Sequence, residues 1–217
     1  MRILTLDSAL ARCSAALVTD GTVLAHRVHD AARGHAALLP VIVRDILAEA
    51  GAPSFDLVAV TVGPGSFTGI RAGLALAQGL ALASDMPIVA VTVGEALAFG
   101  LQPPTGRALW IATDSRRGRV FLERDGAVAA FDLTALPRPS GPVALAGDAG
   151  HIVAAWLAAK DIDVMLTNAR LPGPEGIAAA AEARRLGALP ALAAQPLYID
   201  PPEAKPPAGG LRPPPQA

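Results

Sequence analysis

Two features of this chain could carry out chemistry: a glycine-rich segment and two aspartates at the ends of apolar runs. Residues 63–69 read Gly-Pro-Gly-Ser-Phe-Thr-Gly, between a predicted buried strand and a predicted helix. In that position backbone N–H groups can hold an anion such as phosphate. The segment has no lysine for a Walker A motif, and Pro64 and Thr68 replace the glycines of a nucleophile elbow around Ser66. We therefore favour a tight turn that brings a helix close to a sheet, with a phosphate site as the alternative.

Asp7 and Asp114 each end a predicted strand, and each is followed by a serine. Sugar kinases and actin-like folds hold a metal–nucleotide complex at equivalent strand ends, so an ATP-dependent enzyme of that class is one hypothesis. Asp-Ser is also a turn former, because the carboxylate accepts hydrogen bonds from nearby N–H groups. Since no glycine-rich phosphate loop follows either aspartate directly, we favour the turn and predict no catalytic residue.

The histidines and the cysteine predict no metal site and no bound cofactor. A metal pair on a helix needs ligands four residues apart, and the residue four after His35 is Leu39. His26 and His29 lie three apart on a predicted strand, so they point to opposite faces. The single Cys13 lies in an apolar strand, which is typical of a small core residue.

The composition indicates one or two globular domains in the cytoplasm and argues against a freestanding nucleic-acid binder. The 217 residues are 52% hydrophobic, with 18 basic and 19 acidic side chains. Domains that bind nucleic acid alone usually carry a strong basic excess. No apolar run reaches the length of about 18 residues that indicates a membrane span. The sequence has one local basic cluster, Arg116, Arg117, Arg119 and Arg124. We interpret it as a solvated hairpin edge, with a contact for RNA or an acidic partner as the alternative.

Apolar periodicity predicts an α/β arrangement that occurs twice. The first half reads βββαβαβ, with strands at 2–7, 13–19, 22–28, 57–62 and 87–91 and helices at 35–50 and 69–84. The second half has strands at 107–113, 118–124, 127–132 and 143–146 and helices at 150–159 and 175–187. In both halves a strand ending in Asp-Ser leads to an Asp-Gly pair, which favours a type I′ hairpin turn. The repeat indicates a duplicated βββ unit, with a boundary at the break in 102–106.

The two helices of the first half indicate a binding surface. Small residues occupy every fourth position of helix 69–84 and form a ridge without bulky side chains; they are Gly69, Gly73, Ala77 and Ala81. Another helix could approach such a ridge closely. In helix 35–50, Leu38 and Ile42 extend the apolar surface beyond what a core requires. A joint apolar patch on both helices would mark an interface, and burial against the second half of the chain is the alternative.

Six stretches resemble the TsaB family, whose members are also called YeaZ. They are 3–8, 13–17, 35–40, 63–71, 78–81 and 114–118, of which Gly-Pro-Gly-Ser-Phe-Thr-Gly-Ile-Arg at 63–71 is highly specific. The resemblance covers residues 1–125 closely and the rest loosely. It implies an actin-like ATPase fold (ASKHA, ribonuclease H-like) of duplicated βββαβα lobes, at 1–102 and 103–200. We expect the proline-rich tail at 201–217 to be disordered.

The resemblance also implies a function without catalysis. Members of this family are cytoplasmic subunits of the bacterial complex that makes threonylcarbamoyladenosine in tRNA. The partner is the TsaD transferase, the ATPase TsaE joins them, and tRNA binds only through the complex. The metal pair of TsaD is incomplete here, because Leu39 stands at its second histidine position. The partner contacts that the family implies for this sequence are His35, Leu38, Leu39, Ile42, Gly69, Arg71, Gly73, Leu76 and Ala77.

Two charges depart from the pattern of the family. Arg119 stands where the family usually has an acidic residue, and Asp200 follows Tyr198-Ile199 where the family usually has an arginine. Because both reverse a charge, we expect contacts of the second lobe or the C-terminal strand to differ. The sequence leaves open a homodimer of the lone chain through the same helices, and a nucleotide at the junction with the partner.

Overall fold

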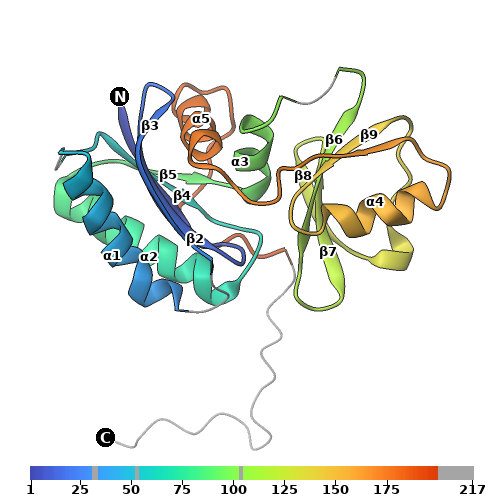
Figure 1. Ribbon diagram of the computed structural model, residues 1–217, viewed down its shortest axis with the longest axis horizontal. Helices are drawn as coiled ribbons and strands as arrows, with labels where there is room; N and C mark the ends of the chain where they lie inside the picture. The colour runs from blue at the N-terminus through green and yellow to red at the C-terminus, as the bar shows by residue number, and fades with distance from the viewer. Residues whose placement is uncertain (31–33, 52–53, 103–104, 200–217) are drawn as a thin grey trace, which may run out of the picture.

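Two five-stranded β-sheets stand side by side in the computed structural model, which describes residues 1–30, 34–51, 54–102 and 105–199 (Figure 1). The first sheet contains β1 (Arg2–Asp7), β2 (Cys13–Thr19), β3 (Thr22–His29), β4 (Leu57–Thr61) and β5 (Ile88–Val91). The second contains β6 (Ala108–Asp114), β7 (Arg119–Arg124), β8 (Ala127–Asp132), β9 (Val143–Ala146) and β10 (Val164–Leu166). The helices are α1 (His35–Glu49), α2 (Phe67–Ser84), α3 (Val93–Phe99), α4 (Gly150–Ala158) and α5 (Pro174–Arg185), with a 3-10 turn, η1, at Leu133–Ala135.

The two sheets share one strand order, which confirms the predicted duplication. The order β3-β2-β1-β4-β5 corresponds to β8-β7-β6-β9-β10. In each sheet the first three strands of the unit are antiparallel and the later strands pair in parallel. Both predicted hairpin turns have positive φ at their two central residues, 49° and 78° at Asp20-Gly21 and 52° and 74° at Asp125-Gly126. A type I′ turn requires these angles.

The sequence does not predict the two short elements α3 and β10. They have 7 and 3 residues, too few for apolar periodicity to distinguish them from a loop. α3 nevertheless begins with a capping box: the Glu95 N–H donates to the Thr92 hydroxyl, and the Thr92 N–H donates to the Glu95 carboxylate. α2 begins at Phe67 rather than at 69, because the Ser66 hydroxyl caps it by accepting from the Gly69 N–H.

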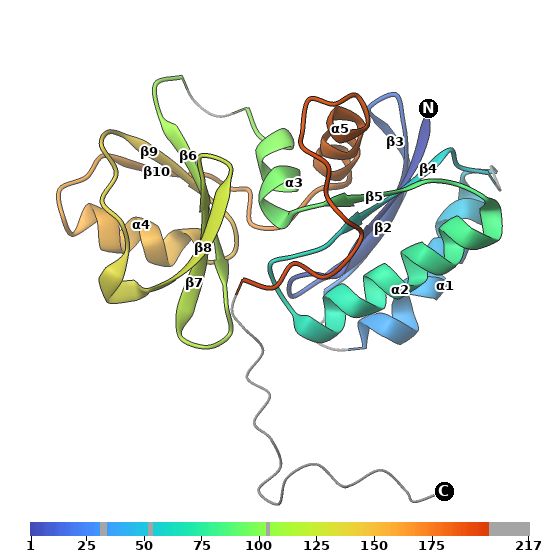
Figure 2. The ribbon, with the colours of Figure 1, turned by 180° about the vertical axis from the view of Figure 1, so that it is seen from behind.

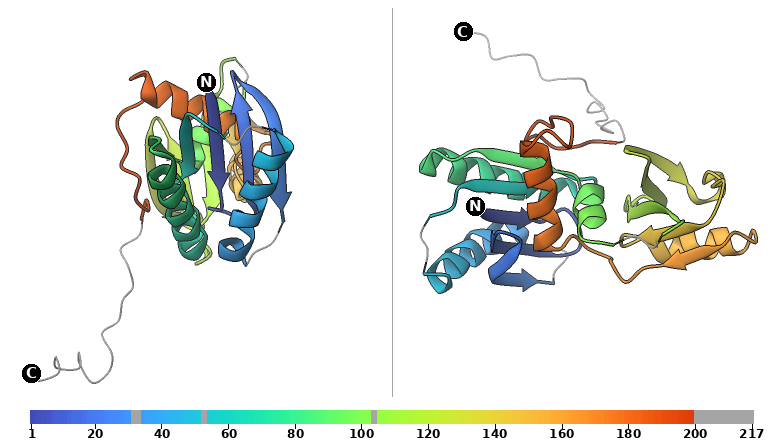
Figure 3. Two further views of the ribbon diagram at one scale, coloured as in Figure 1. Left: turned by 90° about the vertical axis from the view of Figure 1, so that its left-hand side faces the viewer. Right: turned by 90° about the horizontal axis from the view of Figure 1, so that it is seen from above.

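Helices cover both faces of the first sheet (Figure 1, Figure 3). α1 and α2 lie on one face, and α5 lies on the other. Side chains of β1 alternate between them: Leu4 and Leu6 belong to the core under α1 and α2, and Ile3 belongs to the core under α5. Full burial of a leucine contributes about 1.5–3 kcal/mol. Because both faces of β1 are covered, Ile3, Leu4, Thr5 and Leu6 are all buried, and the strand lacks the alternation of a half-exposed one.

The end of the described chain returns from the second lobe to the first. α5 follows β10 in sequence, yet it packs against α3 and the first sheet. The segment after α5 also packs on the core of the first sheet, through Leu192, Ala194 and Leu197. The lobe boundary at residue 102 stays a prediction. This boundary assigns residues 174–199 to the second lobe, although they contact the first lobe. Asp200 and the tail 201–217 lie outside the described residues.

We expect Gly176→Ala to lower the free energy of unfolding by about 1–3 kcal/mol. A Cβ at Gly176 would lie 2.0 Å from the carbonyl oxygen of Ala96, so α5 would have to move away from α3. Denaturant unfolding measures the effect. Gly141→Ala is the control, because a Cβ there meets nothing within 4 Å. Equal stability of the two variants would contradict the close packing of α3 and α5.

Candidate functional site

The glycine-rich segment 63–69 is a packed turn between the loop after β1 and the start of α2. The Ser66 N–H donates to the Ala9 carbonyl at 2.6 Å. A Cβ at Gly65 would lie 2.1 Å from the same carbonyl oxygen, so only glycine fits there. Because the N–H groups of Ser66 and Gly69 already donate within the chain, the geometry favours the predicted tight turn over an open phosphate cradle.

Asp7 and Asp114 both organise the turns that follow their strands. Asp7 Oδ1 accepts hydrogen bonds from the Thr61 hydroxyl at 2.6 Å and from the Ala9 N–H at 3.1 Å. Asp114 Oδ1 accepts from the Arg116 N–H at 2.8 Å. Each carboxylate therefore holds its own loop, as turn-forming aspartates do.

The second oxygen of Asp7 is the feature of the first lobe that best fits an ATP-dependent enzyme. Oδ2 is buried and has no hydrogen-bond partner within the described ranges. Burial raises the pKa of Asp7, although the Thr61 hydroxyl and the Ala9 N–H favour its charged form. An under-satisfied buried carboxylate costs stability, so this oxygen needs either a proton or a ligand.

The ridge of small residues on α2 faces the interior of the chain, which corrects the prediction that it is open to a partner. Gly69, Gly73 and Ala77 are buried. A Cβ at Gly69 would lie 2.0 Å from the carbonyl oxygen of Ser8, and one at Gly73 would lie 2.6 Å from Ser8 Oγ. The Ser8 hydroxyl donates to the Gly69 carbonyl at 2.8 Å. In a helix of 3.6 residues per turn, residues four apart lie close to one line along the helix. In α2 the small residues at this spacing lie on the side that faces the sheet.

α1 buries two of its expected contact residues and places two on a flank. His35 and Leu39 are buried. Leu38 and Ile42 are partly exposed, and helical spacing puts them on the same flank as Glu49. Glu49 forms an ion pair with an arginine of β3. This flank therefore faces the edge of the sheet and not α2.

Most of the residues that α1 and α2 turn outward are uncharged, and the exposed charges are those of Arg44, Asp45 and Glu49 of α1 and Arg71 of α2. We call this surface the outer helix face; it consists of Ala36, Ala37, Pro40, Val41 and Ala48 of α1 and Thr68, Ala72, Ala75, Gly79 and Leu82 of α2. Leu82 is 86% exposed, and a Cβ at Gly79 would meet nothing within 4 Å. The nearby charges of Arg44 and Asp45 bind each other at 2.7 Å. The main packing neighbours of α1 and α2 among the described elements are each other and the strands of the first sheet (Figure 2).

An aromatic cluster lies at one end of α2 and joins it to the segment after α5. The Arg71 guanidinium lies 3.6 Å from the centre of the Phe67 ring and donates to the Tyr198 hydroxyl at 2.9 Å. The two rings stack with their centroids 5.9 Å apart. Arg71, one of the expected contact residues, is thus exposed and held in place. Leu76, another, is partly exposed and packs against the core of the first sheet.

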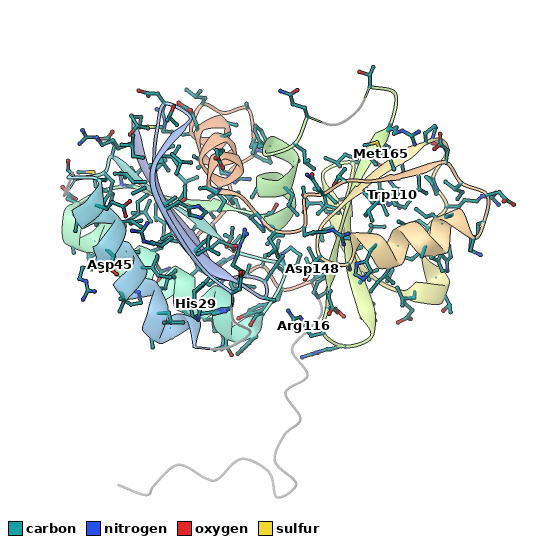
Figure 4. All side chains as sticks on the ribbon, viewed as in Figure 1. His29, Asp45, Trp110, Arg116, Asp148 and Met165 are labelled. Carbon is teal, nitrogen blue, oxygen red and sulfur yellow. The ribbon has the colours of Figure 1, made fainter. Side chains whose placement is uncertain are left out.

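Three of the four arginines of the basic cluster pair with nearby carboxylates, which favours the solvated hairpin edge. Ion pairs join Arg116 to Asp114, Arg119 to Asp132 and Arg124 to Asp125, at 3.7, 3.4 and 3.9 Å. Figure 4 shows Arg116 and Asp148 on the side of this lobe nearest the first lobe. The residues that the structure describes contain no cluster of three His, Cys, Asp or Glu side chains able to hold a metal ion, and no helix long and apolar enough to cross a bilayer.

Comparisons with known proteins identify the family. The profile described as "TsaD: tRNA N6-adenosine threonylcarbamoyltransferase" matches residues 27–135, half of the chain. The tRNA threonylcarbamoyladenosine biosynthesis protein TsaB of Escherichia coli is 40% identical over 124 residues, which cover 56% of this chain and 53% of that protein. The chain belongs to the TsaB family. Its match spans about half the length of this curated relative.

Solved structures confirm the fold of this TsaB-family chain. YeaZ from Pseudomonas aeruginosa superimposes with a TM-score of 0.71 at 29% sequence identity, over 91% of this chain and 99% of that one. An inorganic polyphosphate/ATP-glucomannokinase from Arthrobacter superimposes with a TM-score of 0.50 at 12% identity, over 86% of this chain and 99% of that one. The second likeness is one of fold alone. Together with the duplicated sheets, they confirm the actin-like ATPase (ASKHA) fold.

Asp7→Asn is expected to raise the free energy of unfolding at neutral pH. Burial raises the pKa of Asp7 above 3.8 in the folded chain, so the native state loses stability as the pH rises through that raised value. Asparagine removes the charge and keeps an oxygen that can accept from the Thr61 hydroxyl. Denaturant unfolding at about pH 4 and about pH 8 measures the effect, and the advantage of the variant should be larger at the higher pH.

Asp7→Ala is the matched control for this substitution. It deletes the acceptor of two hydrogen bonds and should cost about 1–3 kcal/mol. An asparagine variant no more stable than the unmodified chain at the higher pH would show that the buried carboxylate carries no cost.

Proposed function

We propose that this chain is the noncatalytic subunit of a complex that forms threonylcarbamoyladenosine in tRNA, and that it binds and stabilises a TsaD-type transferase. Family membership supports the pathway, since the relative from E. coli is named a tRNA threonylcarbamoyladenosine biosynthesis protein. In this proposal the chain works in the cytoplasm without a catalytic residue, cofactor or metal of its own. It meets tRNA and a TsaE-type ATPase only within the complex.

The outer helix face is the observation on which this proposal depends. Val41 and Leu82 are large apolar side chains on this face, 44% and 86% exposed. An exposed apolar surface of this kind is typical of a binding site, and small residues such as Ala75 and Gly79 let another helix come close. Because α1 and α2 pack mainly on each other and on the first sheet, we infer that a separate polypeptide covers their outer side.

The nine contact residues that the family implies divide into two groups by burial, and all of them lie beside or beneath the outer helix face rather than on it. We retain as contacts those that are exposed or partly exposed, namely Leu38, Ile42, Arg71 and Leu76. We assign to the buried ones the task of holding α1 and α2 on the sheet so that the outer helix face points outward; these are His35, Leu39, Gly69, Gly73 and Ala77.

Gly79→Trp is expected to abolish binding to a TsaD-type transferase and to leave the fold intact. Since a Cβ at Gly79 meets open space, the indole adds bulk only on the outer helix face. Calorimetric titration with the transferase measures binding, and thermal unfolding checks the fold. Gly79→Ala is the matched control: it should bind like the unmodified chain and gain about 0.5–1 kcal/mol of stability, because glycine is unfavourable within a helix.

Undiminished binding by the tryptophan variant would overturn the assignment of this face. A homodimer of the lone chain through the same face would also dissociate in that variant. Sedimentation equilibrium of the chain alone, with and without the substitution, separates the two effects.

The alternative is an ATP-dependent enzyme of the sugar-kinase class, which the unpartnered Oδ2 of Asp7 favours. We expect the lone chain to show neither turnover nor micromolar binding of ATP with magnesium, because the Asp114 carboxylate already accepts a hydrogen bond from the Arg116 N–H in its own turn. Calorimetry and a phosphate-release assay measure both. Turnover that disappears in Asp7→Asn would instead establish the enzyme.

A further inference from the structure

A glutamate of the second lobe rests on the first turn of α3. The carboxyl group of Glu123, on β7, fills the space that any side chain at Gly94 would need: a Cβ there would lie 1.8 Å from Oε2 and 2.5 Å from Oε1. Oε2 is buried and has no hydrogen-bond partner in the described part of the chain. Because α3 follows directly on β5 of the first sheet, this contact joins the two lobes.

A second carboxylate next to Glu123 has two partners of its own. Glu95 accepts a hydrogen bond from the Thr92 N–H at 2.8 Å and forms an ion pair with Arg184 of α5. The side chains of Arg184 and Glu95 are only 7% and 17% exposed. Since like charges repel strongly where water is excluded, Glu95 disfavours a charge on Glu123.

Among the residues that the structure describes, the other neighbours of Glu123 supply no cation that compensates its charge. Across the sheet it pairs with Ile111 of β6 and Val128 of β8, which are uncharged. On its own hairpin, the guanidinium of Arg124 lies over the Trp110 ring, 5.5 Å from its centre. Arg184 is engaged by Glu95 and by backbone carbonyls.

These surroundings favour the neutral form of the Glu123 carboxyl group. Burial first and Glu95 second raise the pKa of Glu123 to about 7, although the Thr92 hydroxyl acts in the opposite direction. At neutral pH, protonated and charged forms of Glu123 are therefore both populated.

We propose that Glu123 and the first turn of α3 form a proton-dependent latch between the two lobes. With a proton, the carboxyl rests on Gly94 beside Glu95 and the lobes are held together. Without it, the carboxylate is repelled by Glu95 and drawn to water, and β7 withdraws from α3.

The direction of the pH effect follows from the two states. A glutamate with the ordinary pKa of 4.5 has a pKa of about 7 in the closed contact. The closed form is therefore fully favoured below pH 4.5, and this advantage is lost as the pH rises through about 7. From well below pH 4.5 to well above pH 7 the closing equilibrium should change by about 300-fold in total, a factor of ten for each unit of pKa.

The test is the distance between the lobes as a function of pH. Spin labels on Ser84→Cys in α2 and Ala158→Cys in α4 report it, since both positions are exposed and the native Cys13 is buried. We expect the distances to lengthen and broaden with a midpoint near neutrality. Glu123→Gln, which keeps the shape without the charge, should stay closed throughout. Gly94→Ala, whose Cβ displaces the carboxyl, should stay open throughout.

Thermal unfolding at each pH accompanies the distance measurement and shows that every variant is folded. If Gly94→Ala fails to fold, Glu123→Gln alone decides. The latch is overturned if the glutamine variant follows the same pH dependence as the unmodified chain. It is equally overturned if the unfolding temperature changes with pH while the distance between the lobes does not.

Discussion

The close approach of α2 to the loop after β1 determines which side of that helix reaches solvent. Ser8 fills the space that side chains at Gly69 and Gly73 would need, and its hydroxyl donates to the Gly69 carbonyl. A larger residue at either glycine would lift α2 from the sheet. The opposite side, which includes Ala75 and Gly79, is thereby turned outward and away from the second lobe. Tight packing on one side and accessibility on the other are consequences of the same contact.

Two helices in the middle of the molecule couple the lobes. α3 brings Val93 and Leu97 into a core that also contains Ile111 and Ala146 of the second lobe. α5 is encoded after the second lobe, yet it covers the other face of the first sheet. Neither core is therefore complete without residues from both halves of the chain. If Glu123 loses its proton, its negative charge affects both lobes at once.

The long elements of the fold follow from the sequence because their apolar periods extend over many residues, and the Asp-Gly pairs mark their hairpins. α3 is too short for this signal, although the capping box of Thr92 and Glu95 indicates its start. The structure turns the predicted ridge of α2 toward the sheet, and which side of the helix binds a partner stays a prediction. Small residues at every fourth position suit a sheet-facing side as well as a partner-facing one, and only the position of Ser8 decides between them. The contact of Glu123 with α3 joins distant residues, so no local pattern indicates it.

The segment after α5 completes the flank of α2: the Gln78 amide donates to the Ala194 carbonyl at 3.1 Å, and the Leu197 N–H donates to the Val62 carbonyl at 2.8 Å. During translation, α2 leaves the ribosome long before this segment does. A nascent chain that lacks residues 192–198 therefore displays α2 with one flank bare. The order of synthesis therefore delays the finished flank of α2 until those residues have emerged.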